Sequence, residues 1–276
     1  MSARGGHGQL RVAAAQAAVR VGDLSANAET AARLIKTAAG DGAKVIVFPE
    51  LFLCGYDLAT LRERPDRTDV TIEDPRLDPI RAACGHERVV AVVGASLVRA
   101  SERTISALVF GRDGEVGATY EKTHLHHDER ELFAAGARHV LLELDGWKMG
   151  LGICYDASFP EHARSTAVAG ADAYLCPSAF FADESDHRRS VYFAARVLEN
   201  TFYVVFANFV GKHGGAEFCG QAAIYGPNGR TLASARRRGD AVAVAEIDHA
   251  MLATTRESLT MLRDRIDAPE QVTIAV

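Results

Sequence analysis

The sequence lacks several features that would place it in a special class of protein. No apolar run approaches the roughly 18 residues that a membrane-spanning helix requires. The opening residues, MSARGGHG, contain glycine and polar side chains where a secretory signal peptide has its apolar stretch. Basic residues (31 Lys and Arg) are outnumbered by acidic ones (36 Asp and Glu), and the net charge of −5 argues against nucleic acid or an anionic membrane as a partner. We predict a cytoplasmic protein whose residues 1–8 form a flexible N-terminal segment.

Closely spaced cysteine pairs are also missing. The five cysteines stand at positions 54, 84, 154, 176 and 219, an odd number without any CxxC pair. This spacing argues against a disulfide framework and against a zinc site built from cysteine. A chain of 276 residues needs neither, because it can bury about 75% of the surface of its unfolded state.

Short apolar runs alternate with amphipathic segments, a pattern typical of α/β proteins. Fully apolar strands must be covered on both faces, and no linker rich in proline, glycine or serine divides the chain. We therefore predict one α/β domain over residues 9–276, with two sheets and helices outside them. The predicted strands are 10–16, 44–48, 89–98, 105–110, 116–121, 139–144, 148–153, 173–176, 202–207, 222–225, 231–234 and 241–247, and the predicted helices are 27–39, 159–170, 186–200 and 250–262.

Three residues capable of chemistry stand at the ends of predicted strands. Glu50 ends the segment KVIVFPE, Lys122 closes the strand that begins at Val116, and Cys154 lies between an apolar strand and a predicted helix. Strand ends are where α/β proteins expose reactive side chains, because the strand fixes the backbone while the loop exposes the side chain. A thiol at a strand-to-helix turn lies beside backbone N–H groups, which favour a thiolate and can bind an oxyanion. Taken singly, each residue also fits an ordinary role, as a solvated turn residue or an inert core cysteine.

Six motifs in a fixed order are more specific than any of these residues alone. They are FPE at 48–50, KxHL at 122–125, ExxxFxxG at 129–136, GxxICYDxxFPE at 150–161, RxxEN at 196–200 and IxxPxG at 224–229. Together they resemble the nitrilase superfamily, also called the carbon-nitrogen hydrolases, in its amidase and carbamoylase branch, and the resemblance extends over about residues 10–248. The resemblance implies an α-β-β-α sandwich of two mixed sheets and a Glu-Lys-Cys triad at Glu50, Lys122 and Cys154.

The roles that the resemblance implies fit the chemistry of amide hydrolysis. Glu50 would take the thiol proton of Cys154, pass it to the leaving amine or ammonia, and then activate water against the thioester. Lys122 and the backbone N–H of Tyr155 would stabilise the tetrahedral oxyanion. Glu129 resembles the additional family glutamate that orients the lysine and the substrate; a surface ion pair with Arg130 or another neighbour is the alternative.

Departures from the family pattern bear on the substrate. Ser158 stands where members that bind a substrate carboxylate often have arginine, although Arg188 or Arg189 could supply charge from another loop. Tyr155 and Asp156 stand where nitrile-cleaving members commonly have Trp-Glu, so amide or carbamoyl substrates are favoured over nitriles.

Two further features concern the pocket and the integrity of the site. Tyr56 and Phe180 are candidates for the pocket wall, with packing in the core or at an interface as the alternative. Ala222 replaces the usual serine of the GxSxI segment, which removes a hydrogen bond around the site.

No metal or cofactor is predicted. His124 of the cluster HLHH belongs to the KxHL motif, and the adjacent His126 and His127 would point to different sides of an extended chain. The segment Gly150-Leu-Gly152 lacks the third glycine of a dinucleotide fingerprint.

The sequence therefore predicts a cofactor-free thiol hydrolase of small linear amides, which releases ammonia or an amine. The alternatives are an N-carbamoyl amine amidohydrolase, a nitrilase, and a catalytically silent binding or scaffold protein. The resemblance also implies a homodimer or a larger homo-oligomer, with segments 159–170 and 186–200 as candidate contacts. The substrate itself depends on loops such as 56–74 and 181–187, whose paths the sequence does not predict.

Overall fold

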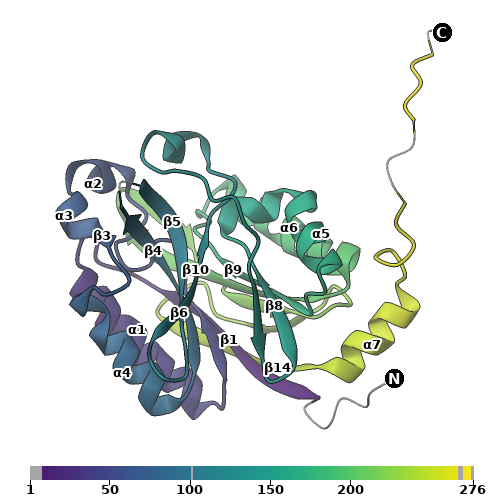
Figure 1. The fold of residues 1–276 in the computed structure, drawn as a ribbon, viewed down its shortest axis with the longest axis horizontal. Coiled ribbons are helices and arrows are strands. Elements are labelled where there is room, and N and C mark those ends of the chain that lie inside the picture. The colour runs from purple at the N-terminus through teal and green to yellow at the C-terminus, as the bar shows by residue number, and fades with distance from the viewer. Residues whose placement is uncertain (1–7, 101, 267–269, 275–276) are drawn as a thin grey trace.

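The computed structural model describes residues 8–100, 102–266 and 270–274. Within them, a curled mixed sheet forms the centre of an α/β fold, with helices against its outer surface (Figure 1). Residues 1–7 of the predicted N-terminal segment lie outside the described residues, and the backbone oxygen of Gly8 accepts a hydrogen bond from the N–H of His249. None of the described helices is long and apolar enough to cross a membrane.

The elements follow one another in an order close to the predicted one. The strands are β1 (Gln9–Ala17), β2 (Val45–Val47), β3 (Asp69–Val70), β4 (Val90–Arg99), β5 (Glu102–Phe110), β6 (Val116–Glu121), β7 (Leu141–Leu144), β8 (Trp147–Leu151), β9 (Ala173–Pro177), β10 (Tyr203–His213), β11 (Ala216–Cys219), β12 (Ala223–Tyr225), β13 (Thr231–Ser234) and β14 (Ala241–Asp248). The α-helices are α1 (Leu24–Gly40), α2 (Leu58–Glu63), α3 (Pro65–Thr68), α4 (Asp78–Glu87), α5 (Pro160–Val168), α6 (Glu184–Asn200) and α7 (His249–Ser258). Three short 3-10 helices are η1 (Pro75–Leu77), η2 (His127–Glu131) and η3 (Cys154–Ser158).

Strand pairing follows one continuous path, β6-β5-β4-β2-β1-β10-β9-β8-β7. The strands from β4 to β8 along this path pair in parallel, whereas β5, β6, β7 and β14 are antiparallel to their neighbours. Strands β1 and β10 pair at Gln16 and Ala17 and so join the two halves of the sheet. The predicted division into two separate sheets is therefore not confirmed by the hydrogen bonding, whereas the mixed α/β character is.

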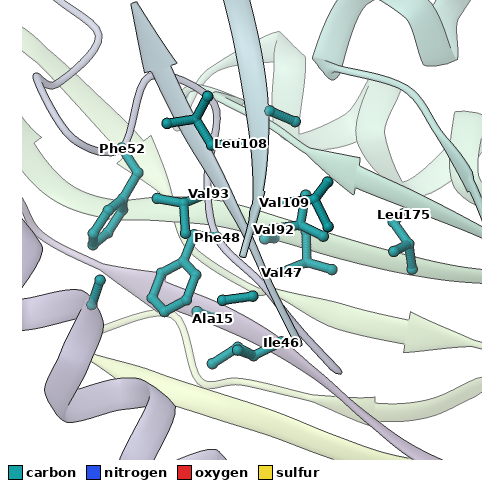
Figure 2. Packing of buried hydrophobic residues seen from close by; sticks show 14 of the residues in the cluster. Ala15, Ile46, Val47, Phe48, Phe52, Val92, Val93, Leu108, Val109 and Leu175 are labelled. Carbon is teal, nitrogen blue, oxygen red and sulfur yellow. The ribbon is translucent and has the colours of Figure 1, made fainter. Parts of the chain in front are cut away.

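The central strands are apolar because both of their faces are covered. All three residues of β2 are buried, and the same holds for the first eight residues of β4. Figure 2 shows side chains of β1, β2, β4, β5 and β9 gathered in one cluster, with Phe48 and Phe52 beyond the end of β2. The rings of Phe48 and Phe52 lie 5.0 Å apart between centroids. This packing fixes the chain immediately before and after Glu50.

Differences from the predicted elements have local causes. Helix α1 begins at Leu24 rather than at residue 27, because the side chain of Asp23 accepts the N–H of Ala26 and caps the helix earlier. Strand β10 continues to His213 because its second half pairs with β11, a strand that the sequence does not predict. Helices α2, α3 and α4 are also unpredicted, since prolines at 65, 75 and 79 interrupt residues 58–87 into short pieces.

Candidate active site

The three residues that stand at predicted strand ends lie together at one edge of the sheet. Glu50 follows β2, Lys122 follows β6 and Cys154 follows β8. Strand β6 is antiparallel to β5, and β5 to β4, so β6 runs in the same direction as the parallel strands and ends at the same edge. Lys122 Nζ lies 2.6 Å from Glu50 Oε1, and both side chains are buried. Cys154 is close enough to Glu50 and Lys122 for each to affect its ionisation.

Two of the turns that carry these side chains adopt a left-handed backbone. Cys154 has φ of 45°, and Leu51, which follows Glu50, has φ of 50°. A residue with a Cβ atom adopts this conformation at a cost of about 1–3 kcal/mol, which the surrounding structure must offset. Sharp turns of this kind direct a side chain out of the end of a strand. Here they carry Glu50 and Cys154, two of the three clustered side chains.

A glycine of β4 leaves the space that the Glu50 turn occupies. A Cβ atom at Gly94 would lie 2.2 Å from the backbone oxygen of Pro49 and 2.5 Å from the nitrogen of Leu51. Any other residue at position 94 would therefore displace the turn by clashing with backbone. Gly94 is not marked as a site residue by the sequence, since a glycine inside an apolar strand carries no chemical signal.

Glu129 completes the charged cluster from the side opposite Glu50. Lys122 Nζ donates to both carboxylate oxygens of Glu129 at 2.7 Å. The hydroxyl of Tyr56 donates to Oε1 of Glu129 at 2.8 Å, and the backbone N–H of His126 donates to Oε2 at 2.7 Å. Glu129 is 1% exposed, and Arg130 instead donates to the backbone oxygen of Leu125, so the alternative of a surface ion pair does not describe Glu129.

Burial controls the ionisation of the cluster. It raises the pKa of Glu50 from 4.5 to about 7, while Lys122 opposes the increase and Glu129 adds to it. Burial alone would lower the pKa of Lys122, but the two carboxylates outweigh it and raise the pKa above its ordinary value. The net charge of the three ionised side chains is −1, so Glu50 can take up a proton near neutral pH.

Cys154 is a neutral thiol in this environment. Burial and the charge of Glu50 raise the pKa of Cys154 well above its ordinary value of 9.0, and the opposing effects of Lys122 and of the backbone N–H of Ala179 are smaller. This differs from the thiolate that a strand-to-helix turn favours. A thiol with a raised pKa needs a base before it can attack, and Glu50 has the pKa for that task.

The turn that carries Cys154 is held in place by residues outside the turn. Arg196 on α6 is buried, and its guanidinium donates to the backbone oxygens of Ala157 and Ser158 at 2.9 and 3.2 Å. Arg196 belongs to the RxxEN motif, so the sequence identifies the residue but not its contact with η3. The contact fixes the C-terminal part of η3 against α6.

The segment after β9 connects to Glu50 and Cys154 as well. The backbone N–H of Glu50 donates to the oxygen of Ser178 at 3.3 Å. Asn208, buried on β10, accepts the N–H of Phe180 at 2.8 Å and donates to its oxygen at 3.2 Å. Asn208 is not predicted from the sequence, because an isolated asparagine in an apolar strand has no pattern that marks it.

The aromatic candidates take different positions. Tyr56 contacts the charged cluster through its hydroxyl, and its ring lies 6.0 Å from that of Phe181. Phe180 is 7% exposed and its ring packs against Phe193 and Phe206 in the second core cluster. Tyr155 follows Cys154, and its ring stands edge-on to His126 at 5.2 Å. The structure therefore brings Tyr56 and Tyr155 to the site, whereas the side chain of Phe180 faces the core.

The described residues contain no group of three or more His, Cys, Asp or Glu side chains arranged to hold a metal ion. His124 of the HLHH cluster is engaged by Asp156, with 2.9 Å between Nδ1 and Oδ1. The chemistry available from the described side chains is therefore a thiol, a carboxylate base, and an ammonium group held by a second carboxylate.

Comparisons with known proteins find a matching family model, similar sequences and similar structures. A family model described as carbon-nitrogen hydrolase matches residues 11–257. Among curated relatives, the 2-oxoglutaramate amidase of Bacillus subtilis (strain 168) is 33% identical over 80% of this chain and 85% of its own length. The protein named nitrilase of Pyrococcus abyssi (strain GE5 / Orsay) is 31% identical over 87% of this chain and 90% of its own length.

Solved structures of an amidase from Nesterenkonia sp. AN1 share the fold. A double mutant of that amidase in complex with acrylamide has a TM-score of 0.81 and 26% identity to this chain, with 96% of each chain covered. Another mutant carries the acetamide moiety of fluoroacetamide covalently attached to the active-site cysteine; it also has a TM-score of 0.81 and 26% identity, with 94% of each chain covered.

Proposed function

This chain belongs to the carbon-nitrogen hydrolase family, and we propose that Glu50, Lys122 and Cys154 are its catalytic triad. It is a cysteine-dependent hydrolase of carbon-nitrogen bonds other than peptide bonds, of the amidase type. The observation that carries the assignment of residues is the buried cluster in which Lys122 lies 2.6 Å from Glu50 and 2.7 Å from Glu129. A buried cation beside a thiol and a carboxylate base suits a reaction that develops negative charge on a carbonyl oxygen.

Glu50 accepts and donates the protons in both half-reactions. It takes the thiol proton as the sulfur of Cys154 attacks the amide carbon, and the carbonyl electrons move to oxygen. Glu50 then gives that proton to the amide nitrogen, the C–N bond breaks, and ammonia or an amine leaves. Glu50 next takes a proton from water as the water attacks the thioester, and the C–S bond breaks to release the acid. The proton finally returns to the sulfur.

Lys122 stabilises the oxyanion of both tetrahedral intermediates. Its raised pKa keeps it positively charged throughout the neutral range. The backbone N–H of Tyr155, the residue after the nucleophile, is the second donor. Glu129 holds the lysine from the other side, and Tyr56 fixes Glu129 through their 2.8 Å hydrogen bond. Tyr56 and its ring neighbour Phe181 form the pocket wall in this proposal, with Phe180 supporting that wall from the core.

An uncharged small amide is the substrate class that the site favours. Ser158 offers no cation for a substrate carboxylate. The two arginines that could replace it have local partners, since Arg188 donates to Ser185, and Arg189 to Asp186 and Tyr225. Hydrolysis of an N-carbamoyl amine, with release of ammonia and carbon dioxide, uses the same three groups and is the alternative. Nitrile hydrolysis and a silent scaffold are less favoured.

The test of the substrate class is ammonia release from three matched sets: aliphatic amides, N-carbamoyl amines and aliphatic nitriles. We expect turnover of short amides, and none after the protein is alkylated with iodoacetamide. Turnover of the carbamoyl set alone would replace the main assignment by the alternative. No turnover in any set, combined with equally slow alkylation of all five cysteines, would contradict an enzymatic role.

The two halves of the sheet fit the two layers of an α-β-β-α sandwich in this proposal. Helices α1 and α4 pack together over one half, and α5 and α6 pack together over the other.

We also assign residues 9–276 to one catalytic domain, since the family match spans nearly all of that range. A cytoplasmic location is supported by the five free cysteines, because disulfides are rare in that compartment.

A homodimer through α5 and α6 is part of the same proposal. Apolar side chains on these helices are exposed, with Val168 at 47%, Val191 at 50% and Leu198 at 39%. We expect sedimentation velocity at micromolar protein to give a dimer or a larger species, and Val191→Glu to shift it toward a monomer. A wild-type protein that sediments as a monomer would contradict this arrangement.

A further inference from the structure

Asp156 is a buried carboxylate that accepts five hydrogen bonds. Its Oδ1 accepts from the Thr123 hydroxyl at 2.8 Å, from the backbone N–H of His124 at 2.8 Å and from His124 Nδ1 at 2.9 Å. Its Oδ2 accepts from the Tyr120 hydroxyl at 2.7 Å and from the backbone N–H of Ile153 at 2.9 Å. The side chain is 0% exposed, so every donor is a protein group held at a fixed position.

Four of these five donors come from the two loops that carry Lys122 and Cys154, and the fifth, Tyr120, lies on β6 just before Lys122. Thr123 and His124 are the two residues directly after Lys122, and Ile153 is the residue directly before Cys154. The carboxylate therefore bridges the backbone of one loop to the backbone of the other. It also closes the turn in which Cys154 adopts its left-handed conformation, with φ of 45°.

Neighbouring groups stabilise the negative charge of Asp156. Burial alone would raise its pKa, but the hydrogen bond from His124 and the neighbouring His162, among others, lower the pKa to about 2. A second layer extends behind it: His162 lies 2.8 Å from the Tyr120 hydroxyl and 2.9 Å from the Tyr174 hydroxyl. The Tyr174 hydroxyl packs against the backbone of Gly152, where an added Cβ atom would lie 1.8 Å from it, but it makes no hydrogen bond to Asp156.

We propose that Asp156 is a positioning residue, whose carboxylate sets the distance between the ammonium of Lys122 and the sulfur of Cys154. The inference rests on the proposed function, because it concerns the geometry of that same site. The competing interpretation is a carboxylate that stabilises the fold without affecting the reaction. The two differ in what happens when Asp156 loses its charge while the protein stays folded.

Asparagine separates the two interpretations because all five partners of Asp156 are donors. An amide NH2 in place of Oδ1 would face the backbone N–H of His124, and in place of Oδ2 it would face that of Ile153. Either orientation forces one of the two loops away from the side chain. The matched control is Tyr174→Phe, which removes a hydroxyl from the outer layer and leaves all five hydrogen bonds of Asp156 in place.

We expect Asp156→Asn to lower kcat by about 100-fold, the size of effect that a displacement near 1 Å produces, with KM changed by less than about threefold. Alkylation of Cys154 by iodoacetamide should slow by about tenfold, and the midpoint of its pH profile should move upward, since Lys122 no longer lowers the thiol pKa as strongly. Mere loss of a neighbouring negative charge would move the midpoint downward. Tyr174→Phe should leave kcat and the alkylation profile within about twofold of the wild type.

Folding is monitored in parallel by thermal unfolding of each variant. If Asp156→Asn does not fold, Thr123→Val removes one donor and keeps the backbone contacts; we then expect about fivefold slower alkylation of Cys154. A folded Asp156→Asn with kcat and alkylation profile like Tyr174→Phe would overturn the inference, as would a Thr123→Val that alkylates at the wild-type rate. Failure of the proposed function would give a different result from failure of this inference. In that case, Cys154 of the wild type would react with iodoacetamide no faster than the other four cysteines.

Discussion

Cys154→Ala should abolish amide hydrolysis, with a loss of at least about 10⁴-fold in kcat, because no other nucleophile can form the thioester. Cys154 is the only described cysteine that is partly exposed, whereas Cys54, Cys84, Cys176 and Cys219 are buried. The measurement is ammonia release from the best amide substrate, with mass spectrometry of the protein after rapid acid quench. The wild type should carry an acyl adduct on the peptide that contains Cys154, and the variant should carry none.

Cys84→Ala is the matched control for this substitution. Cys84 is buried on α4, and burial raises the pKa of its thiol to about 12, so it takes no part in the reaction at neutral pH. We expect this variant to keep its activity within about twofold. A Cys154→Ala protein that retained more than about 1% of the wild-type rate would contradict the role of Cys154 as nucleophile.

Glu50→Gln should lower kcat by about 10³–10⁴-fold, because it removes the carboxylate that we propose takes the thiol proton. The same substitution should make the protein more stable at pH 8. The pKa of Glu50 is about 7 in the folded protein against 4.5 as its ordinary value. Its ionisation therefore opposes folding, and the stability lost grows as pH rises from 4.5 through about 7. Glutamine avoids this loss, so the free energy of unfolding at pH 8 should rise by about 1–3 kcal/mol.

The pH dependence of kcat/KM in the wild type tests the role of Glu50 as base without a mutation. A base acts in its deprotonated form, so kcat/KM should rise with pH through a midpoint near the pKa of Glu50, about 7. Exposed Glu29 on α1 supplies the control, since Glu29→Gln should change neither the midpoint nor the stability by a measurable amount. An acid limb centred near pH 4.5, or a Glu50→Gln variant less stable than the wild type at pH 8, would argue against a proton-accepting Glu50.

The proposed triad is predicted from the sequence by the motifs that resemble the family, and each of its members also stands at the end of a strand. Strand and loop are local properties, and Glu50, Lys122 and Cys154 are each a few residues from an apolar run. Parallel pairing places the ends of β2 and β8 at one edge, and the two antiparallel steps from β4 through β5 to β6 bring Lys122 to the same edge. The packing of α/β layers follows from the same apolar pattern, which is why most strands and the longer helices are predicted.

The remaining parts of the site depend on contacts between distant segments. The hydroxyl of Tyr56 reaches Glu129 across 73 positions of sequence, and no local pattern encodes that meeting. The side chain of Phe180 packs in the core, whereas that of the next residue, Phe181, lies beside Tyr56, because the direction of each depends on how the chain leaves β9. Asp156 is visible as part of a motif, but only the fold reveals that its donors come from both catalytic loops.

Strand β6 occupies one end of the sheet path and pairs with β5, and only Tyr120 among its residues is buried. Edge segments of this kind open by local fluctuations that require less free energy than global unfolding. Lys122 directly follows this strand, so opening of β6 would withdraw the cation that we propose for the oxyanion while β1, β2 and β10 stay protected from hydrogen exchange. We therefore expect activity to depend on the stability of one peripheral cooperative unit rather than on that of the whole sheet.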